Sequence, residues 1–173
     1  VLQRTGNLPL SIKYYEKAAE LNPNELSIIS SLALAYNSNK QFRESNEAYE
    51  KALKIDPDNA LILNNYAYNL STRGENLNKA LDMVRKAVNK EPGNSSYLDT
   101  MGWIYYMMKD YKSAKEYIER AVSVNGSNAV ILEHLGDIHY ALKDNQKALY
   151  FWKKALEINR NNTQLEEKIN FLK

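Results

Sequence analysis

The stretch Ala48–Pro57, AYEKALKIDP, decides the fold, because versions of it return along the whole chain. The other versions are YYEKAAELNP at residues 14–23, MVRKAVNKEP at 83–92, YIERAVSVNG at 117–126 and FWKKALEINR at 151–160. All five share an alanine at their fifth position, and the successive spacings of these alanines are 34, 35, 34 and 34 residues. Self-similarity at such a fixed period is typical of proteins built from stacked repeats.

Two further series of small residues keep the same register. One lies seven residues before each shared alanine, and its members are Ser11, Ser45, Ala80, Ala114 and Ala148. The other lies further upstream, and its members are Ala33, Ala67, Gly102 and Gly136. Small side chains at a helix crossing let two backbones approach closely. Each period is therefore predicted to consist of two packed helices joined by a short polar turn, with Pro23, Pro57 and Pro92 stopping the second helix.

This spacing resembles the tetratricopeptide repeat, a 34-residue helix–turn–helix unit. The resemblance implies an all-α fold, a right-handed α-solenoid of antiparallel helix pairs that forms one domain over residues 1–173. We expect a truncated first repeat at about 1–25, in which VLQRT is the stub of the first helix. Four complete repeats and a capping helix are expected to follow at 26–59, 60–94, 95–128, 129–162 and 163–173.

Three local features refine this expectation. The repeat 60–94 has one extra residue in RGENLNKA, which is expected to lengthen its internal turn. In the capping helix, Thr163 and Glu166 have the spacing of a capping box, and one apolar face is expected to seal the last repeat. The chain opens on Val1 rather than Met, and its first repeat is incomplete, so we expect it to be a fragment with more repeats upstream.

Composition excludes several classes of function. A net charge of +2 argues against nucleic-acid binding, which requires a basic face. The absence of cysteine excludes a disulfide framework and a thiolate metal site. No apolar run reaches the length of a membrane span, so we expect no direct insertion into a membrane.

In the tetratricopeptide repeat family the first helix of each pair lines the concave side of the array. In each repeat the packing residues leave six positions of this helix unused, namely 2, 5, 6, 9, 12 and 13. These positions fall on one helical stripe. This stripe predicts a partner-binding groove, whose candidate residues are Asn64, Asn65, Tyr68, Asp99, Thr100, Trp103, Tyr106, Met107, Glu133, His134, Asp137 and Tyr140.

Aromatic and charged residues suggest what the groove binds. Trp103 falls on the groove side, where it would anchor a partner together with neighbouring tyrosines, although neighbouring helices could instead bury its ring as core. Asp99, Glu133 and Asp137 are the charged residues in the bodies of the four complete first helices, which hold no Lys or Arg. The groove is therefore expected to be neutral at one end and acidic at the other, which favours a neutral to basic partner segment.

The sequence holds no pattern of catalytic or metal-binding chemistry. His134 and His139 lie five residues apart, so they do not share a helix face as a metal-binding pair would. We therefore expect no enzyme activity, no metal and no cofactor, and the leading hypothesis is a protein–protein interaction module, an adaptor for a partner peptide or protein. The alternatives are a scaffold that self-associates through its uncapped N-terminal end, and a regulatory or targeting domain of a larger enzyme.

A second resemblance concerns location. NNYAYNLSTRGENLNKALDMV at 64–84, followed by YLDTMGWIYY at 97–106, is similar to repeat arrays of bacterial envelope proteins, including outer-membrane lipoproteins that serve as adaptors. This resemblance implies the periplasmic side of the cell envelope rather than the cytoplasm.

Overall fold

The computed structural model describes residues 8–172, which form ten α-helices and no β-strand. The helices are α1 (Leu8–Leu21), α2 (Leu26–Ser38), α3 (Phe42–Ile55), α4 (Ala60–Thr72), α5 (Leu77–Lys90), α6 (Ser95–Met107), α7 (Tyr111–Val124), α8 (Ala129–Ala141), α9 (Asn145–Ile158) and α10 (Thr163–Phe171). The predicted helical stub VLQRT lies outside the described residues.

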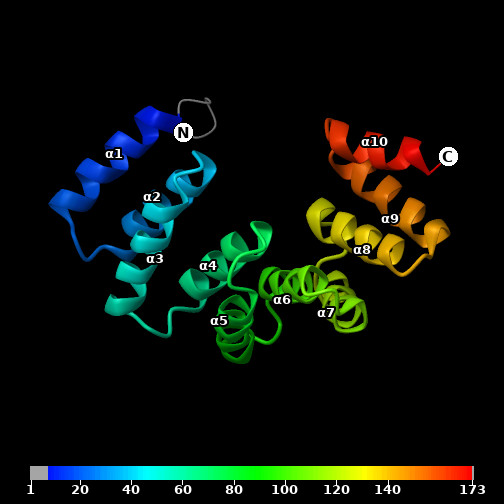
Figure 1. Cartoon of the computed structure of the whole chain (residues 1–173), viewed down its shortest axis with the longest axis horizontal. Helices are drawn as coiled ribbons and strands as arrows, with labels where there is room; N and C mark the ends of the chain where they lie inside the picture. The colour runs from blue at the N-terminus through cyan, green and yellow to red at the C-terminus, as the bar shows by residue number, and fades with distance from the viewer. Residues whose placement is uncertain (1–7, 173) are drawn as a thin grey trace.

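The helices pack in consecutive antiparallel pairs, α2 with α3, α4 with α5, α6 with α7, and α8 with α9. Figure 1 shows the pairs following one arc, with both ends of the chain on the same side of it. The predicted fold class, an all-α solenoid of helix pairs closed by a C-terminal capping helix, is confirmed. In the part of the chain that the structure describes, no helix has both the length and the apolar character that crossing a bilayer requires.

Side-chain caps fix where the first helix of each pair begins. Asn59, Asn94 and Asn128 precede α4, α6 and α8, and the side chain of each accepts a hydrogen bond from a backbone N–H of the first turn. Such caps satisfy N–H groups that have no partner within the helix. Pro23, Pro57 and Pro92 lie just beyond the ends of α1, α3 and α5, as the sequence predicts, because proline disfavours helical continuation.

The predicted capping box of α10 is wrong. Asn162 is the N-cap, and its Oδ1 accepts a hydrogen bond from the N–H of Leu165 at 3.0 Å, so Thr163 is the first helical residue. Asparagine is a better N-cap than threonine, and it stands one position earlier in the chain. The extra residue predicted for 60–94 is confirmed in the turn 73–76, where Gly74 has a φ of 69°.

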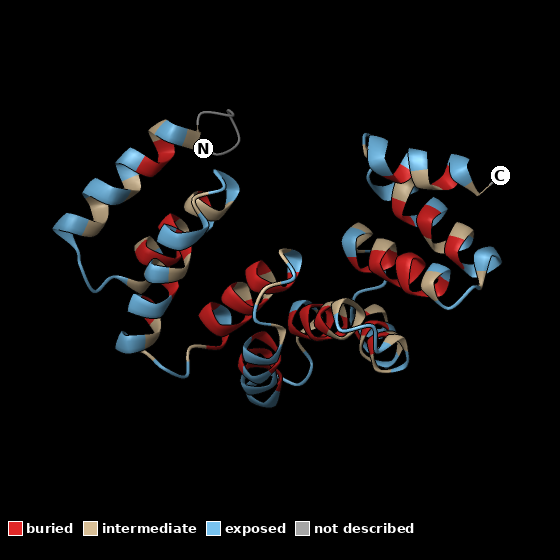
Figure 2. Cartoon of the chain, in the orientation of Figure 1, coloured by how far each residue is buried: buried red, intermediate tan, exposed pale blue. Residues whose placement is uncertain are grey.

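The small-residue series lie where helices cross. The shared alanines from Ala52 onward are fully buried, as are Ala33 and Ala67 of the upstream series. A Cβ added to Gly102 would lie 2.6 Å from Cγ1 of Ile118, which is much closer than carbon atoms approach without strain. Figure 2 shows the buried residues between the helices and the exposed residues on the outer surfaces of the array. The repeat period of the sequence therefore records a packing constraint.

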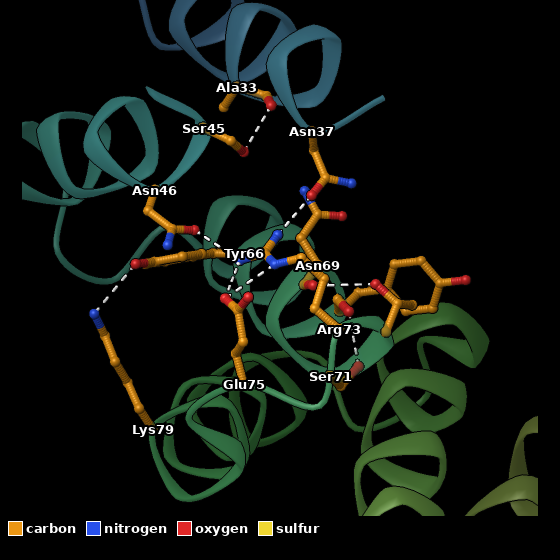
Figure 3. Close-up of polar contacts among 12 residues, drawn as sticks. Ala33, Asn37, Ser45, Asn46, Tyr66, Asn69, Ser71, Arg73, Glu75 and Lys79 are labelled. Carbon is orange, nitrogen blue, oxygen red and sulfur yellow. Dashed lines mark hydrogen bonds and ion pairs between the residues drawn. The ribbon is translucent and has the colours of Figure 1, made fainter. Parts of the chain in front are cut away.

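Arg73, at the end of α4, ties two successive helix pairs together (Figure 3). Its guanidinium donates hydrogen bonds to Asn37 Oδ1 at 2.6 Å and to Asn46 Oδ1 at 2.9 Å, and it pairs with Glu75 at 3.0 Å. The Arg73 side chain is only 9% exposed and also lies over the Phe42 ring. A planar guanidinium with several donors suits such a shared contact, because each N–H points in a fixed direction.

Candidate functional site

All of the predicted site residues lie on α4, α6 and α8, the first helices of three successive pairs. These helices contact one another along one side of the array, and the predicted residues on that side, five of which are buried, form what we call the inner wall. The structure gathers ten of the twelve predicted residues into a polar hollow, a ring stack and part of an aromatic hollow, and leaves out Met107 and Glu133.

The polar hollow has a volume of about 250 Å³ and lies between α4, α6 and the start of α8. Five predicted residues line it, namely Asn64, Asn65, Tyr68, Asp99 and Thr100. The other lining residues are Ser96, Asn128, Val130 and Ile131, so amide, hydroxyl and carboxylate groups stand beside two aliphatic side chains in this part of the wall.

Hydrogen-bonding capacity remains in this hollow. Asn64 is 6% exposed, and its Nδ2 donates to Asn65 Oδ1 at 3.4 Å, whereas its Oδ1 has no partner among the described residues. Thr100 Oγ1 donates to the backbone oxygen of Ser96 at 3.0 Å. Burial raises the pKa of Tyr68, so its hydroxyl keeps its proton and can donate. Tyr68 thus offers a donor to an incoming group, whereas the free acceptor of Asn64 is enclosed and must turn toward the hollow to be used.

Trp103 belongs to a ring stack beside the polar hollow. Its centroid lies 4.2 Å from the ring of His134 and 4.8 Å from that of Tyr106. His134 Nδ1 in turn lies 2.8 Å from Asp99 Oδ1, which links α8 to α6. The indole is half-buried, and its Nε1 is enclosed without a partner among the described residues. Trp103 therefore contributes to packing between α6 and α8 and also to the surface of the wall.

Lys168 of α10 changes the charge expected at the acidic end of the wall. Its Nζ donates to Glu133 Oε1 at 2.9 Å and to both carboxylate oxygens of Asp137 at 2.8 Å. Glu133 also accepts a hydrogen bond from Asn162, and Asp137 accepts one from the indole of Trp152. The expectation of a basic partner rests on carboxylates such as those of Glu133 and Asp137. Because these two are already bonded within the chain, they no longer support that expectation.

Burial and charge act against each other in this pair. Burial raises the pKa of Asp137, and the ammonium group of Lys168 only partly offsets that effect. Burial alone would lower the pKa of Lys168, but its hydrogen bonds to Asp137 and Glu133 outweigh burial and raise it. Lys168 is thus held in its charged form at neutral pH, where it serves as the counter-ion of the inner wall.

The aromatic hollow has a volume of about 490 Å³ and lies at the C-terminal end of the wall. Three predicted residues, Tyr106, Asp137 and Tyr140, line it. Residues that the sequence analysis did not select complete it, namely Trp152 of α9 and Glu167, Lys168 and Phe171 of α10.

A signal for the missed α10 residues is present in the sequence. Thr163 stands 34 residues after Ala129, so α10 continues the register of α8. Glu167, Lys168 and Phe171 then occupy the fifth, sixth and ninth positions, which are groove positions in the preceding repeats. A helix that only capped the array would not need this correspondence, so the expectation of a cap does not include these positions.

Four predicted residues, Trp103, Glu133, His134 and Met107, line neither hollow, and Met107 stands outside the ring stack as well. Its side chain lies near the turn 73–76, because a Cβ added to Gly74 would be 3.8 Å from Met107 Cε. Among the described residues, no group of three or more His, Asp or Glu side chains is placed to hold a metal ion.

Comparisons with known proteins agree on one family. Family models described as tetratricopeptide repeat match residues 71–167, 48–82, 1–25 and 27–59. The first of these matches alone covers more than half of the chain.

Individual relatives are more distant. The chain is 30% identical over 113 residues to the BBSome complex member BBS4 of Bos taurus, a match that covers 65% of this chain and 21% of that protein. It is 29% identical over 119 residues to the type IV pilus assembly protein PilF of Pseudomonas aeruginosa, covering 67% of this chain and 46% of that protein. The chain thus spans less than half the length of either relative.

A solved structure supports the fold. A thermophilic tetratricopeptide repeat protein of Thermus thermophilus superposes with a TM-score of 0.84 at 17% identity, covering 99% of this chain and 93% of that one.

Proposed function

This chain belongs to the tetratricopeptide repeat family, and we propose that it is a non-enzymatic interaction module whose inner wall binds a segment of a partner protein. The family and the fold support protein binding in general. The place of binding and the chemistry of the partner are inferred from the side chains of the inner wall.

The observation that carries this proposal is the unpaired Oδ1 of Asn64 beside the polar hollow. A buried acceptor without a donor costs about 1–3 kcal/mol. The Oδ1 atom is enclosed, so a turn of the Asn64 side chain toward the hollow would let a partner N–H remove that cost, while Asn65 and Tyr68 would supply further polar contacts. We therefore place the centre of the binding site at the polar hollow, between α4, α6 and α8.

The Trp103 stack supports a rigid wall rather than a flexible one. Rings held against each other lose little side-chain entropy when a partner binds, because their rotamers are already restricted. The Asp99–His134 contact holds the same region together across two helices. The proposal requires no basic residue of the partner at the polar hollow, since the carboxylates of Glu133 and Asp137 already pair with Lys168.

The test compares two double variants in affinity capture from cells that contain the native partner. The wall variant carries Asn65→Ala and Tyr68→Ala, both at half-buried positions of α4. The matched control carries Tyr150→Ala and Lys154→Ala, which alter an exposed tyrosine and lysine of α9 outside both hollows. Proteins recovered by the wild type are then titrated against each variant by calorimetry.

We expect the wall variant to bind the recovered partner at least about tenfold more weakly, the effect of losing one hot-spot tyrosine. The control is expected to bind within about twofold of the wild type. Equal binding by the wall variant and the wild type would reject the polar hollow as the site. Both variants must keep a free energy of unfolding within about 1 kcal/mol of the wild type, so that a loss of binding is not a loss of fold.

Self-association is a second candidate, favoured by the outer face of α1. Tyr14 and Leu21 are large apolar residues of α1 that are more than half exposed. A second copy that packs on this face would remove them from water. Light scattering over a concentration series tests this candidate, because a Tyr14→Ser, Leu21→Ser variant should stay monomeric at concentrations where the wild type associates. A wild-type mass that does not change with concentration would exclude it.

The proposed location is the periplasmic side of a bacterial cell envelope. Its support is the similarity to a protein named for type IV pilus assembly. The other relative is named as a member of the BBSome complex, and that name adds no support for this location. Fractionation of the native host with an antibody against this chain tests the location, which a purely cytoplasmic signal would exclude.

A further inference from the structure

The aromatic hollow joins the capping helix to the inner wall. Its floor is the indole of Trp152, which is 3% exposed and donates its N–H to Asp137 at 2.9 Å. Tyr106, Tyr140 and Phe171 stand around this floor and come from three different helices. The floor is therefore fixed by packing and by a hydrogen bond, as a preformed site requires.

Phe171 is unusually exposed for its size. The residue is 79% exposed and lines the hollow, as does Tyr140, which is 37% exposed. Apolar surface gathered around a concave floor differs from scattered exposed residues, because one incoming side chain can cover all of it at once. The volume of about 490 Å³ lies within the range of roughly 300–1,000 Å³ that is usual for ligand pockets.

The charges around this hollow do not balance. Lys168 is the one ammonium group that lines it, and it is shared between the carboxylates of Glu133 and Asp137. Glu167 adds a third carboxylate at the rim, and its side chain makes no hydrogen bond or ion pair among the described residues. Three carboxylates thus face one cation, which leaves an excess of negative charge at the edge of an apolar floor.

We propose that the aromatic hollow receives one apolar side chain of a partner segment, of leucine or phenylalanine size, that is flanked in the partner by Lys or Arg. The apolar side chain covers exposed surface of Tyr140 and Phe171 above the buried Trp152, and the flanking cation lies beside Glu167. This inference rests on the proposed function and deepens it, because it assigns a second subsite, built largely by α9 and α10, at the end of the inner wall.

The test uses three capped tripeptides as probes, with the sequences Lys-Leu-Lys, Lys-Ser-Lys and Glu-Leu-Glu. Each is titrated into the whole chain while two-dimensional NMR follows the ring signals of Phe171 and the indole N–H of Trp152. We expect Lys-Leu-Lys to shift both signals and to bind at least about threefold more tightly than the other two peptides. The preference over Glu-Leu-Glu should shrink in high salt, which screens exposed charges.

A pair of neighbouring variants isolates the role of Glu167. Glu167→Gln is expected to weaken binding of Lys-Leu-Lys by about twofold to fivefold, the range for one exposed ion pair. Glu166→Gln makes the same charge change at the adjacent exposed residue, which does not line the hollow, and is expected to leave the affinity unchanged. Equal effects of the two variants would overturn the charge assignment.

Three further outcomes also decide against the inference. Glu-Leu-Glu or Lys-Ser-Lys could bind as well as Lys-Leu-Lys, or no probe could move Phe171 and Trp152. The signals of Phe171 could also shift on dilution of the protein alone, which would mean that a second copy of the chain covers the hollow. Shifts confined to Asn64 and Tyr68 would overturn this inference and leave the proposed function standing. If instead the wall variant binds the partner as tightly as the wild type does, only the proposed function is overturned.

Discussion

Gly136→Ala tests whether the small-residue register reflects close packing at the site. In an exposed helix this change stabilises by about 1 kcal/mol, because alanine is the better helix former. At position 136, however, the new Cβ would lie 2.3 Å from Cδ1 of Trp152. Carbon atoms prefer a separation of about 3.5–4.0 Å, so the indole would have to move by roughly 1 Å.

The energetic balance follows from what that movement breaks. Overpacking of this kind costs about 1–3 kcal/mol. The hydrogen bond from Trp152 Nε1 to Asp137, at 2.9 Å, contributes about 1 kcal/mol more and is lost when the ring shifts. After the gain in helix propensity is subtracted, we expect Gly136→Ala to destabilise by about 1–3 kcal/mol, which lowers the melting temperature by roughly 2–10 °C for a chain of this size.

Thermal and urea unfolding followed by circular dichroism measure this effect, and hydrogen exchange locates it in α8–α10, because a solenoid opens locally. Gly93→Ala is the matched control, since a Cβ at Gly93 meets nothing within 4 Å, and it should stay within about 0.5 kcal/mol of the wild type. In a Trp152→Leu background Gly136→Ala should become neutral or stabilising. A Gly136→Ala variant that melts at or above the wild-type temperature would refute the packing argument.

Two other changes probe the scaffold. Arg73→Met should destabilise by about 2–3 kcal/mol, because it removes charged hydrogen bonds to Asn37 and Asn46 from a largely buried position, and chemical unfolding would measure the loss. His139 should make stability depend on pH. Burial lowers the pKa of His139 below the usual value of about 6.5. Below that pH the imidazole is protonated more readily in the unfolded chain than in the folded one, so the free energy of unfolding should fall as the pH drops below about 6.5. Unfolding curves at pH 7 and pH 5.5 should differ less for His139→Gln than for the wild type, and an equal difference would contradict this assignment.

The fold was predictable because one constraint is repeated along the chain. A crossing of two helices needs a small residue at a fixed place, and Ala33, Ala67, Gly102 and Gly136 mark that place in successive pairs. Positions on the inner wall follow from helix geometry once the crossings are known. The sequence could therefore place Asn64, Asp99 and Tyr106 on one side without any knowledge of their contacts.

Contacts between side chains of different repeats were harder to predict. Lys168 and Glu133 are 35 residues apart in the sequence. Their contact depends on the conformation of the flexible four-carbon side chain of Lys168. The stack of Trp103 on His134 depends likewise on two rotamers that helix periodicity does not specify. The N-cap at Asn162 was missed for a different reason, because two competent capping residues stand next to each other.

The capping helix shows why sealing an array and extending its binding surface need not be separate tasks. Leu165 and Ile169 bury one face of α10 against the last pair, and this docking fixes the direction of every other position on the helix. Because α10 keeps the register of α8, its fifth, sixth and ninth positions must then continue the inner wall. Lys168 at the sixth position balances carboxylates that would otherwise repel one another, and Phe171 at the ninth remains exposed beside them. A residue that served only to seal the last pair would gain nothing from being apolar and solvated, so sealing does not account for the exposure of Phe171, which the partner side chain proposed above would cover.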